Sequence, residues 1–174
     1  MRLRRIRRRR WPFVLGSFLL VLGGWACSAG RIEGGVFYSQ KGYRVTLPVR
    51  QGWEVAADGP ADLLLRRPAS RAGIVVNATC QGNAPARSLA VLSRHLTFGF
   101  HGKEVLEREE PTVAGHHAVR VLFEGRLDET PVQVEAYVVK GERCVYDLIY
   151  VAPPAEFAGG AEDFRAVVGS FVGP

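Results

Sequence analysis

Few side chains in this sequence combine the types and spacing that catalysis or metal binding requires. His116 and His117 are adjacent, and neighbouring residues of a strand point to opposite faces, so we expect two solvated histidines beside a turn. His95 and His101 are placed on or just after a predicted helix and fall on different faces of it. The histidines therefore predict no metal centre.

The carboxylates give a similarly plain prediction. Four of them cluster and could bind a cation weakly, although a solvated strand and turn is the usual meaning of such a run. They are Glu104, Glu107, Glu109 and Glu110. Asp147 interrupts an apolar strand and is expected either to face solvent or to pair with an arginine such as Arg120. No phosphate-binding loop, HExxH or GxSxG motif is present, which predicts a protein that is not an enzyme and has no cofactor.

The N-terminus has the pattern of a secretory signal peptide. Residues 1–10 read MRLRRIRRRR, and residues 11–26 carry no charge and end in small residues. The alternative is a retained transmembrane helix. Sixteen helical residues span roughly 24 Å, less than the ~30 Å of a hydrocarbon core. We expect residues 1–26 to be the signal peptide, with its arginines on the cytoplasmic side and the rest of the chain exported.

The basic charge of the chain belongs to this leader. The full sequence has a formal net charge of +6, from 23 Lys and Arg and 17 Asp and Glu. Seven of the basic residues lie within residues 1–10, and no acidic residue precedes Cys27. From Cys27 onward, 16 basic residues face 17 acidic ones, a net charge of −1. Binding to nucleic acid is therefore not predicted, since no basic stripe with interleaved aromatics occurs later in the chain.

Cys27 stands directly after the leader. The segment Gly24-Trp25-Ala26-Cys27 resembles the lipobox of bacterial lipoproteins. The resemblance implies that Cys27 is acylated, for example by palmitate, and becomes the N-terminal residue after cleavage. Several acyl chains together hold a protein firmly to a membrane. The alternative is an ordinary cysteine that pairs elsewhere.

The other two cysteines, Cys80 and Cys144, lie at the end and at the start of apolar, β-rich segments. In neighbouring antiparallel strands these two ends lie side by side, and an exported chain is in an oxidising compartment. A disulfide between Cys80 and Cys144 is one interpretation. The other is two buried free thiols that behave as small hydrophobic side chains.

The mature chain is predicted to be a short tether, residues 27–36, followed by one domain, residues 37–174. Apolar and polar residues alternate in seven segments bounded by turn residues, which predicts strands. These segments are 43–48, 62–68, 73–80, 103–109, 117–125, 130–139 and 144–152. Ser88 suits the N-cap of a first helix, and residues 154–171 carry the apolar stripe of a second. Grouped strands with helices after each group indicate an α+β fold, an antiparallel sheet covered by helices.

The order of these elements and several residues resemble the PsbP-like α/β/α sandwich family and DcrB-like exported bacterial lipoproteins. The resemblance rests on GYRVTLPVRQGWEV, DLLLRRP, SLAVL and EDFRAVVGSF. It implies a non-catalytic binding or assembly domain at the periplasmic side of a membrane, with a protein partner in an envelope complex. It supplies no active-site residues. We expect the contact patch around the exposed loops 81–87 and 126–130.

Two other functions stay open. One is a carrier of an apolar ligand, with a groove between sheet and helix lined by Phe98, Phe100, Tyr137 and Tyr150. The other is a hydrolase whose site forms only in space.

Overall fold

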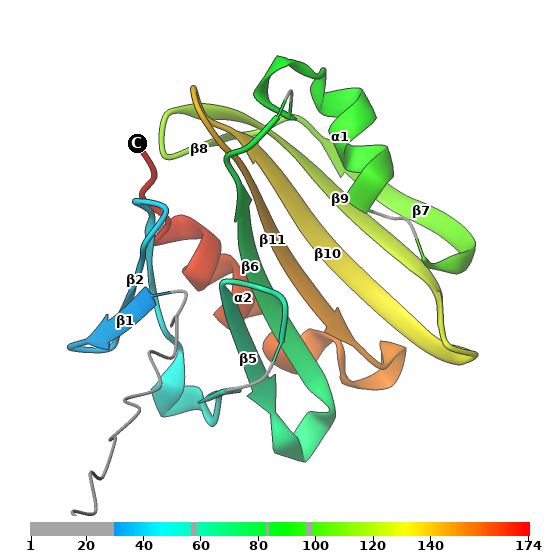
Figure 1. Cartoon of the computed structure of the whole chain (residues 1–174). Coiled ribbons are helices and arrows are strands. Elements are labelled where there is room, and N and C mark those ends of the chain that lie inside the picture. The colour runs from blue at the N-terminus through cyan, green and yellow to red at the C-terminus, as the bar shows by residue number, and fades with distance from the viewer. Residues whose placement is uncertain (1–29, 57–58, 83, 97–98) are drawn as a thin grey trace, which may run out of the picture.

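The computed structural model describes residues 30–56, 59–82, 84–96 and 99–174 (Figure 1). Cys27 and the predicted signal peptide, residues 1–26, lie outside these ranges. Within them, no helix has both the length and the apolar composition needed to cross a membrane.

Eleven strands and two α-helices make up the described residues. In chain order they are β1 (Gly30–Glu33), β2 (Val36–Ser39), β3 (Arg44–Thr46), β4 (Glu54–Val55), β5 (Leu63–Arg67), β6 (Ala72–Thr79), α1 (Leu89–Leu96), β7 (His101–Glu109), β8 (Thr112–Val113), β9 (His116–Leu127), β10 (Thr130–Lys140), β11 (Val145–Ala152) and α2 (Ala158–Gly169). Every predicted strand and both predicted helices are present, with small shifts at their ends.

The main sheet is antiparallel throughout and has the order β4-β5-β6-β11-β10-β9-β7, with the short β8 paired to β9. The neighbours β9, β10 and β11 are joined by short turns, as the meander pattern predicted. Strand β6 pairs with β11, from Gly73 opposite Val151 to Thr79 opposite Val145. This pairing joins the two halves of the chain.

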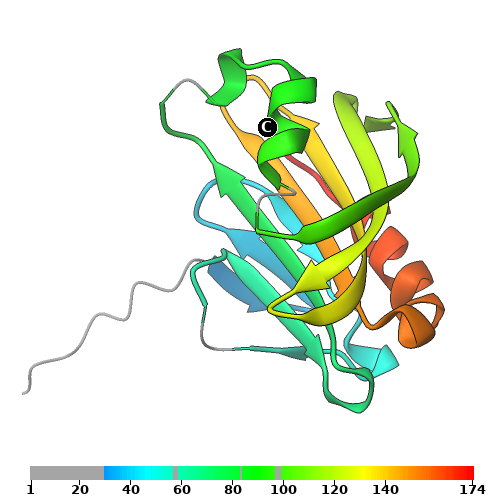
Figure 2. The ribbon, with the colours of Figure 1, turned by 90° about the vertical axis from the view of Figure 1, so that its right-hand side faces the viewer.

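The two helices cover opposite faces of this sheet, and Figures 1 and 2 show α1 and α2 on its two sides. Val132, Val134 and Ala136 of β10 point to the face under α1, where they pack with Leu89. Tyr137 points to the other face and packs against Phe164 of α2, with ring centroids 5.9 Å apart. The structure is therefore the predicted α+β sandwich.

Helix α1 begins after its predicted cap, and helix α2 packs through its predicted apolar stripe. The backbone N–H of Val91 donates to Ser88 Oγ at 3.4 Å, so Ser88 caps α1. In α2, Phe164, Val167 and Val168 are buried. Phe171, just after the helix, is buried as well. Their spacing places one apolar stripe against the sheet.

Residues 30–36 correct the prediction of a tether. Strand β1 pairs with β2, from Gly30 opposite Ser39 to Glu33 opposite Val36. The turn between them is Gly34-Gly35, whose φ angles are 58° and 79°. A two-residue hairpin of this kind needs positive φ at both central residues, which glycine adopts without strain. The predicted tether over residues 27–36 is therefore wrong from Gly30 onward.

Strands β1, β2 and β3 form a second, three-stranded sheet beside the main one. Phe37 and Val45 of this small sheet are buried in the main core. Its outer strand β3 is joined to the C-terminal segment, because Arg44 and Val172 exchange two backbone hydrogen bonds of 2.9 and 3.0 Å. The small sheet thus fastens the beginning of the domain to its end.

Candidate functional site

Cys80 and Cys144 form a disulfide in the structure, in agreement with the first interpretation of these residues. Cys80 directly follows β6, and Cys144 directly precedes β11, where Thr79 lies opposite Val145. The strand end and the strand start are therefore neighbours, as expected. Cys144 is buried and Cys80 is exposed.

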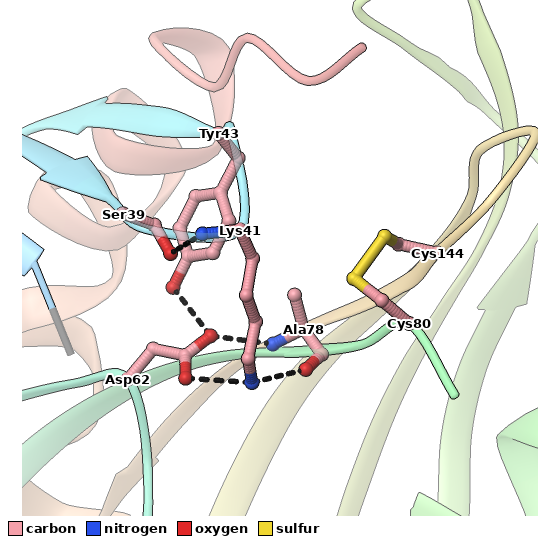
Figure 3. Close-up of a disulfide and its surroundings, with 7 residues drawn as sticks. All are labelled: Ser39, Lys41, Tyr43, Asp62, Ala78, Cys80 and Cys144. Atoms are coloured by element: carbon pink, nitrogen blue, oxygen red, sulfur yellow. Dashed lines mark hydrogen bonds and ion pairs between the residues drawn. A yellow bond between two sulfur atoms is a disulfide. The ribbon is translucent and has the colours of Figure 1, made fainter.

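A small polar network lies beside this disulfide (Figure 3). The Asp62 carboxylate accepts hydrogen bonds from the Ala78 backbone N–H at 2.9 Å and from the Tyr43 hydroxyl at 3.2 Å. Its other oxygen lies 2.8 Å from Lys41 Nζ, which also donates to the Ala78 carbonyl. Burial, reinforced by the charge of Asp62, raises the pKa of Tyr43, so its hydroxyl stays a donor. The network holds the turn after β2 to the end of β6 and is structural.

A second polar cluster is built around Glu135 of β10, whose side chain is fully buried. The Glu135 carboxylate accepts from Arg120 Nε at 2.7 Å and from Arg165 of α2 through two bonds of 3.1 Å. The bonds to Glu135 raise the pKa of Arg165. Burial by itself would lower the pKa of Arg120, but its hydrogen bonds to Glu135 and Glu107 outweigh this effect and raise the pKa. The cluster is therefore a set of ion pairs around one buried carboxylate, in which both arginines keep their charge.

Two of the acidic residues of β7 complete this cluster. Arg120 Nη1 lies 2.6 Å from Glu107 and 3.4 Å from Glu109. Glu107 and Glu109 thus face an arginine, which is not an arrangement for binding a cation. Because Arg120 pairs with Glu135, Glu107 and Glu109, it is not the partner expected for Asp147.

Asp147 lies on the α1 face of the sheet, with Val138 of β10 and Asn77 of β6 opposite it. Its side chain is half-buried. Burial raises the pKa of this carboxyl from 3.8 to about 6. Burial favours the neutral form of this carboxyl. Between about pH 4 and 6, Asp147 therefore keeps its proton in the native protein but has released it in the unfolded chain.

We therefore predict a stability penalty from Asp147 that grows as the pH rises through this window and is complete at neutral pH. Asp147→Asn should raise the free energy of unfolding by about 1–2 kcal/mol at pH 7, below the ~3 kcal/mol that two pKa units represent. At pH 4, where this penalty has only begun, the gain should be much smaller. Urea unfolding at both pH values measures this. An equal gain at pH 4 would show that the charge of Asp147 is not the cause.

The four histidines are not brought together. His95 Nε2 lies 3.4 Å from Arg87 Nη1 at the surface, and His101 is exposed at the start of β7. His116 is half-buried and His117 exposed at the start of β9. Across the described part of the chain, no three His, Cys, Asp or Glu side chains are arranged to hold a metal ion.

The groove predicted for an apolar ligand is not formed by the expected residues. Phe100 packs on Phe123, with ring centroids 5.2 Å apart, on the α1 face. Tyr137 and Tyr150 pack against Phe164 on the α2 face. Phe98 lies outside the described residues. The sheet itself separates Phe100 from the two tyrosines, so this prediction is wrong.

The two loops predicted to form one contact patch are also far apart. Lys140, the last residue of β10, donates to the carbonyl of Arg87 in the loop 81–87. The loop 126–130 meets β10 at its first residue, Thr130. An extended strand rises about 3.4 Å per residue, so the length of β10 separates the two loops. A single patch cannot include both.

A hollow of about 710 Å³ at the β5–β6 end of the sheet is the strongest candidate binding site. We call it the β5–β6 hollow. Its lining residues are Glu54, Val55, Ala56, Leu64, Arg66, Arg67, Pro68, Arg71, Ala72, Gly73 and Val151. Val55 is 43% exposed, and Leu64 and Val151 are half-buried, so part of its surface is apolar.

Among the lining residues that the structure describes, three arginines surround this apolar surface, and Glu54 is the one acidic side chain. Arg66 and Arg71 are exposed, whereas Arg67 donates to the Gly159 carbonyl at 2.6 Å. Arg71 reaches Glu156 only at 3.8 Å, with its side chain 75% exposed. The hollow suits a ligand or peptide segment with an apolar body and an acidic group.

Comparison with known proteins identifies the fold. No family model matches the sequence, and no curated protein matches it. Solved structures that share the fold include the following three.

The first is LpqN of Mycobacterium tuberculosis, described as involved in cell envelope biogenesis, with a TM-score of 0.61 and 15% identity over 77% of this chain and 85% of LpqN. The second is the cyanobacterial PsbP of Synechocystis sp. PCC 6803, with a TM-score of 0.54 and 13% identity over 90% of this chain and 99% of that one. The third is PA94 of Pseudomonas aeruginosa, a putative regulator of unknown function, with a TM-score of 0.53 and 15% identity over 75% of this chain and 91% of PA94.

The domain therefore has a PsbP-like fold, as the resemblance implied. At these identities the likeness concerns the fold alone.

Proposed function

We propose that this protein is an envelope lipoprotein of DcrB-like type, anchored through Cys27, whose PsbP-like domain is a non-enzymatic binding or assembly factor. The basic leader, the uncharged segment and Ala26-Cys27 support the anchor. The disulfide suits an oxidising compartment. The structural neighbour LpqN is described as involved in cell envelope biogenesis, which supports a role in the envelope.

The β5–β6 hollow is the observation that carries the binding role. It offers apolar surface and accessible guanidinium groups, and the described residues of its lining include no serine, cysteine or histidine that could act as nucleophile or base. The arginines provide bidentate donors for a carboxylate. We assign the hollow to an apolar segment of a partner protein that carries an acidic residue.

The anchor gives the first test. Cells grown with an alkyne analogue of palmitate should incorporate the label into the wild type and not into Cys27→Ser. The double variant Cys80→Ala/Cys144→Ala is the matched control and should keep the label, because these residues are not in the lipobox-like segment. Equal labelling of Cys27→Ser, or an unlabelled wild type with its full precursor mass, would contradict the proposal.

The hollow gives the second test. A photo-crosslinking amino acid placed at Val55 should capture a protein partner in intact cells. The same amino acid at Val105 of β7, which is 59% exposed and far from the hollow in the sheet order, is the matched control. Charge reversal by Arg66→Glu/Arg71→Glu should reduce the adduct several-fold, since rim charges steer association. An adduct with the mass of a small amphiphile would favour the carrier function instead.

A further inference from the structure

The outer face of the small sheet carries a row of side chains that are not part of the hydrophobic core. Arg31 of β1 lies opposite Tyr38 of β2, and Tyr38 lies opposite Arg44 of β3. Val172 continues the row as the bridge partner of Arg44. Directly opposed residues of antiparallel strands point to the same face, so these four residues line up on one surface.

This row, Arg31, Tyr38, Arg44 and Val172, is accessible. Arg31 and Arg44 are exposed, Tyr38 is half-buried and Val172 is 42% exposed. The guanidinium carbon of Arg31 lies 5.2 Å from the centroid of the Tyr38 ring. The neighbouring row of the same face holds Glu33, Val36 and Thr46, so Glu33 is the acidic side chain closest in register. Glu33 lies 3.8 Å from Arg31, with both side chains more than 70% exposed.

The chemistry of the row is that of a membrane interface. Arginine side chains bind phosphate groups through several N–H donors, and tyrosine places its ring and hydroxyl at the level of lipid headgroups. A cation beside an aromatic ring and an apolar side chain can serve both the charged and the apolar parts of that interface. The domain as a whole has no such charge, because the chain from Cys27 onward carries −1.

The position of the row relative to Cys27 supplies the second argument. Gly30 begins β1, three residues after Cys27, and Arg31 is the next residue. Three extended residues span about 10 Å, which is close to the Debye length at physiological ionic strength. A lipid on Cys27 would therefore keep Arg31 within the range of a charged membrane surface.

We infer that the outer face of the small sheet is the membrane-facing surface of the domain and binds the headgroups of anionic lipids through Arg31 and Arg44. The inference rests on the anchor at Cys27 proposed above and adds the orientation of the domain. Two arginines near an anionic surface bias the orientation roughly 30-fold over a neutral one. The lipid holds the protein, and the row decides which face meets the membrane.

The test uses the acylated full chain reconstituted on vesicles with lipids brominated near the headgroup. Tyr38→Trp places a fluorescent reporter in the row, and Val172→Trp places a second one there if the first variant fails to fold. Leu127→Trp, which is 40% exposed at the β9–β10 turn, is the control away from the small sheet. In Figure 1 this turn lies at the opposite side of the molecule from β1 and β2. The wild type gives the contribution of the native tryptophans.

On vesicles that contain phosphatidylglycerol, the reporter in the row should lose most of its emission, and the Leu127→Trp reporter should lose little. Arg31→Glu/Arg44→Glu should remove this difference, and so should vesicles of phosphatidylcholine alone. If the row and control reporters are quenched equally on anionic vesicles while the protein stays bound, the orientation is wrong and the anchor stands. If the purified protein lacks the acyl mass and leaves the vesicles, the anchor is wrong and the orientation falls with it.

Discussion

Replacing Glu135 with glutamine should lower the free energy of unfolding by about 3 kcal/mol, because it leaves the buried guanidinium of Arg120 without its main counter-charge. Glu135 is fully buried and accepts hydrogen bonds from both Arg120 and Arg165. Glu107 and Glu109 still compensate part of the charge of Arg120. The expected loss therefore lies at the lower end of the range for a broken buried ion pair. Urea unfolding of both proteins at neutral pH measures the difference.

The matched control is Glu129→Gln, which removes an ion pair with Arg126 whose side chains are 86% and 52% exposed. An exposed pair of this kind contributes less than about 1 kcal/mol. A double variant, Arg120→Met/Glu135→Leu, should recover much of the loss, since buried ion pairs can be replaced by apolar residues of similar volume. If Glu135→Gln costs no more than Glu129→Gln, the cluster does not stabilise the domain in the way described.

Loss of the disulfide should have a larger effect. The bond joins residues 64 positions apart, and a closed loop of this length corresponds to about 4 kcal/mol of unfolded-chain entropy. The Cys80→Ala/Cys144→Ala variant should therefore unfold at a clearly lower urea concentration.

Reduction of the wild type by dithiothreitol should lower its stability toward that of the double variant, and the same treatment should leave the variant unchanged. The Lys41–Asp62 network, which holds the same end of β6, remains in both proteins. A reduced wild type that is as stable as the oxidised one would show that the bond contributes nothing to folding.

Local patterns in the sequence were sufficient for most of the fold. The strands of the meander alternate apolar and polar residues, and the last helix has a clear apolar stripe, so both were predicted. The alternation within residues 130–139 does not reveal that Glu135 is fully buried. Its side of β10 is covered by α2, and a polar position there requires the partners Arg120 and Arg165. Such partners come from other elements and cannot be seen in β10 alone.

The hairpin of β1 and β2 was missed although its signal is present. Gly34-Gly35 between two short segments was interpreted as a flexible tether, whereas two glycines in that setting are also typical of a tight hairpin turn. The β5–β6 hollow could not be predicted, because it depends on Val151 lying next to Gly73. These two residues are brought together only by the pairing of distant strands. The consecutive arginines Arg66 and Arg67, with Arg71 close by, were the one available hint.

The pairing of Arg44 with Val172 determines when the domain can be completed during biosynthesis. Chains are made from the N-terminus, so β3 waits for its partner until residue 172 has been made. Strand β6 likewise waits for β11. Until then both strands present unpaired edges, to which other chains can add. Before residues 145–172 have been made, the nascent domain should therefore be prone to aggregation, and a truncation that removes Val172 should favour aggregation over a smaller folded product.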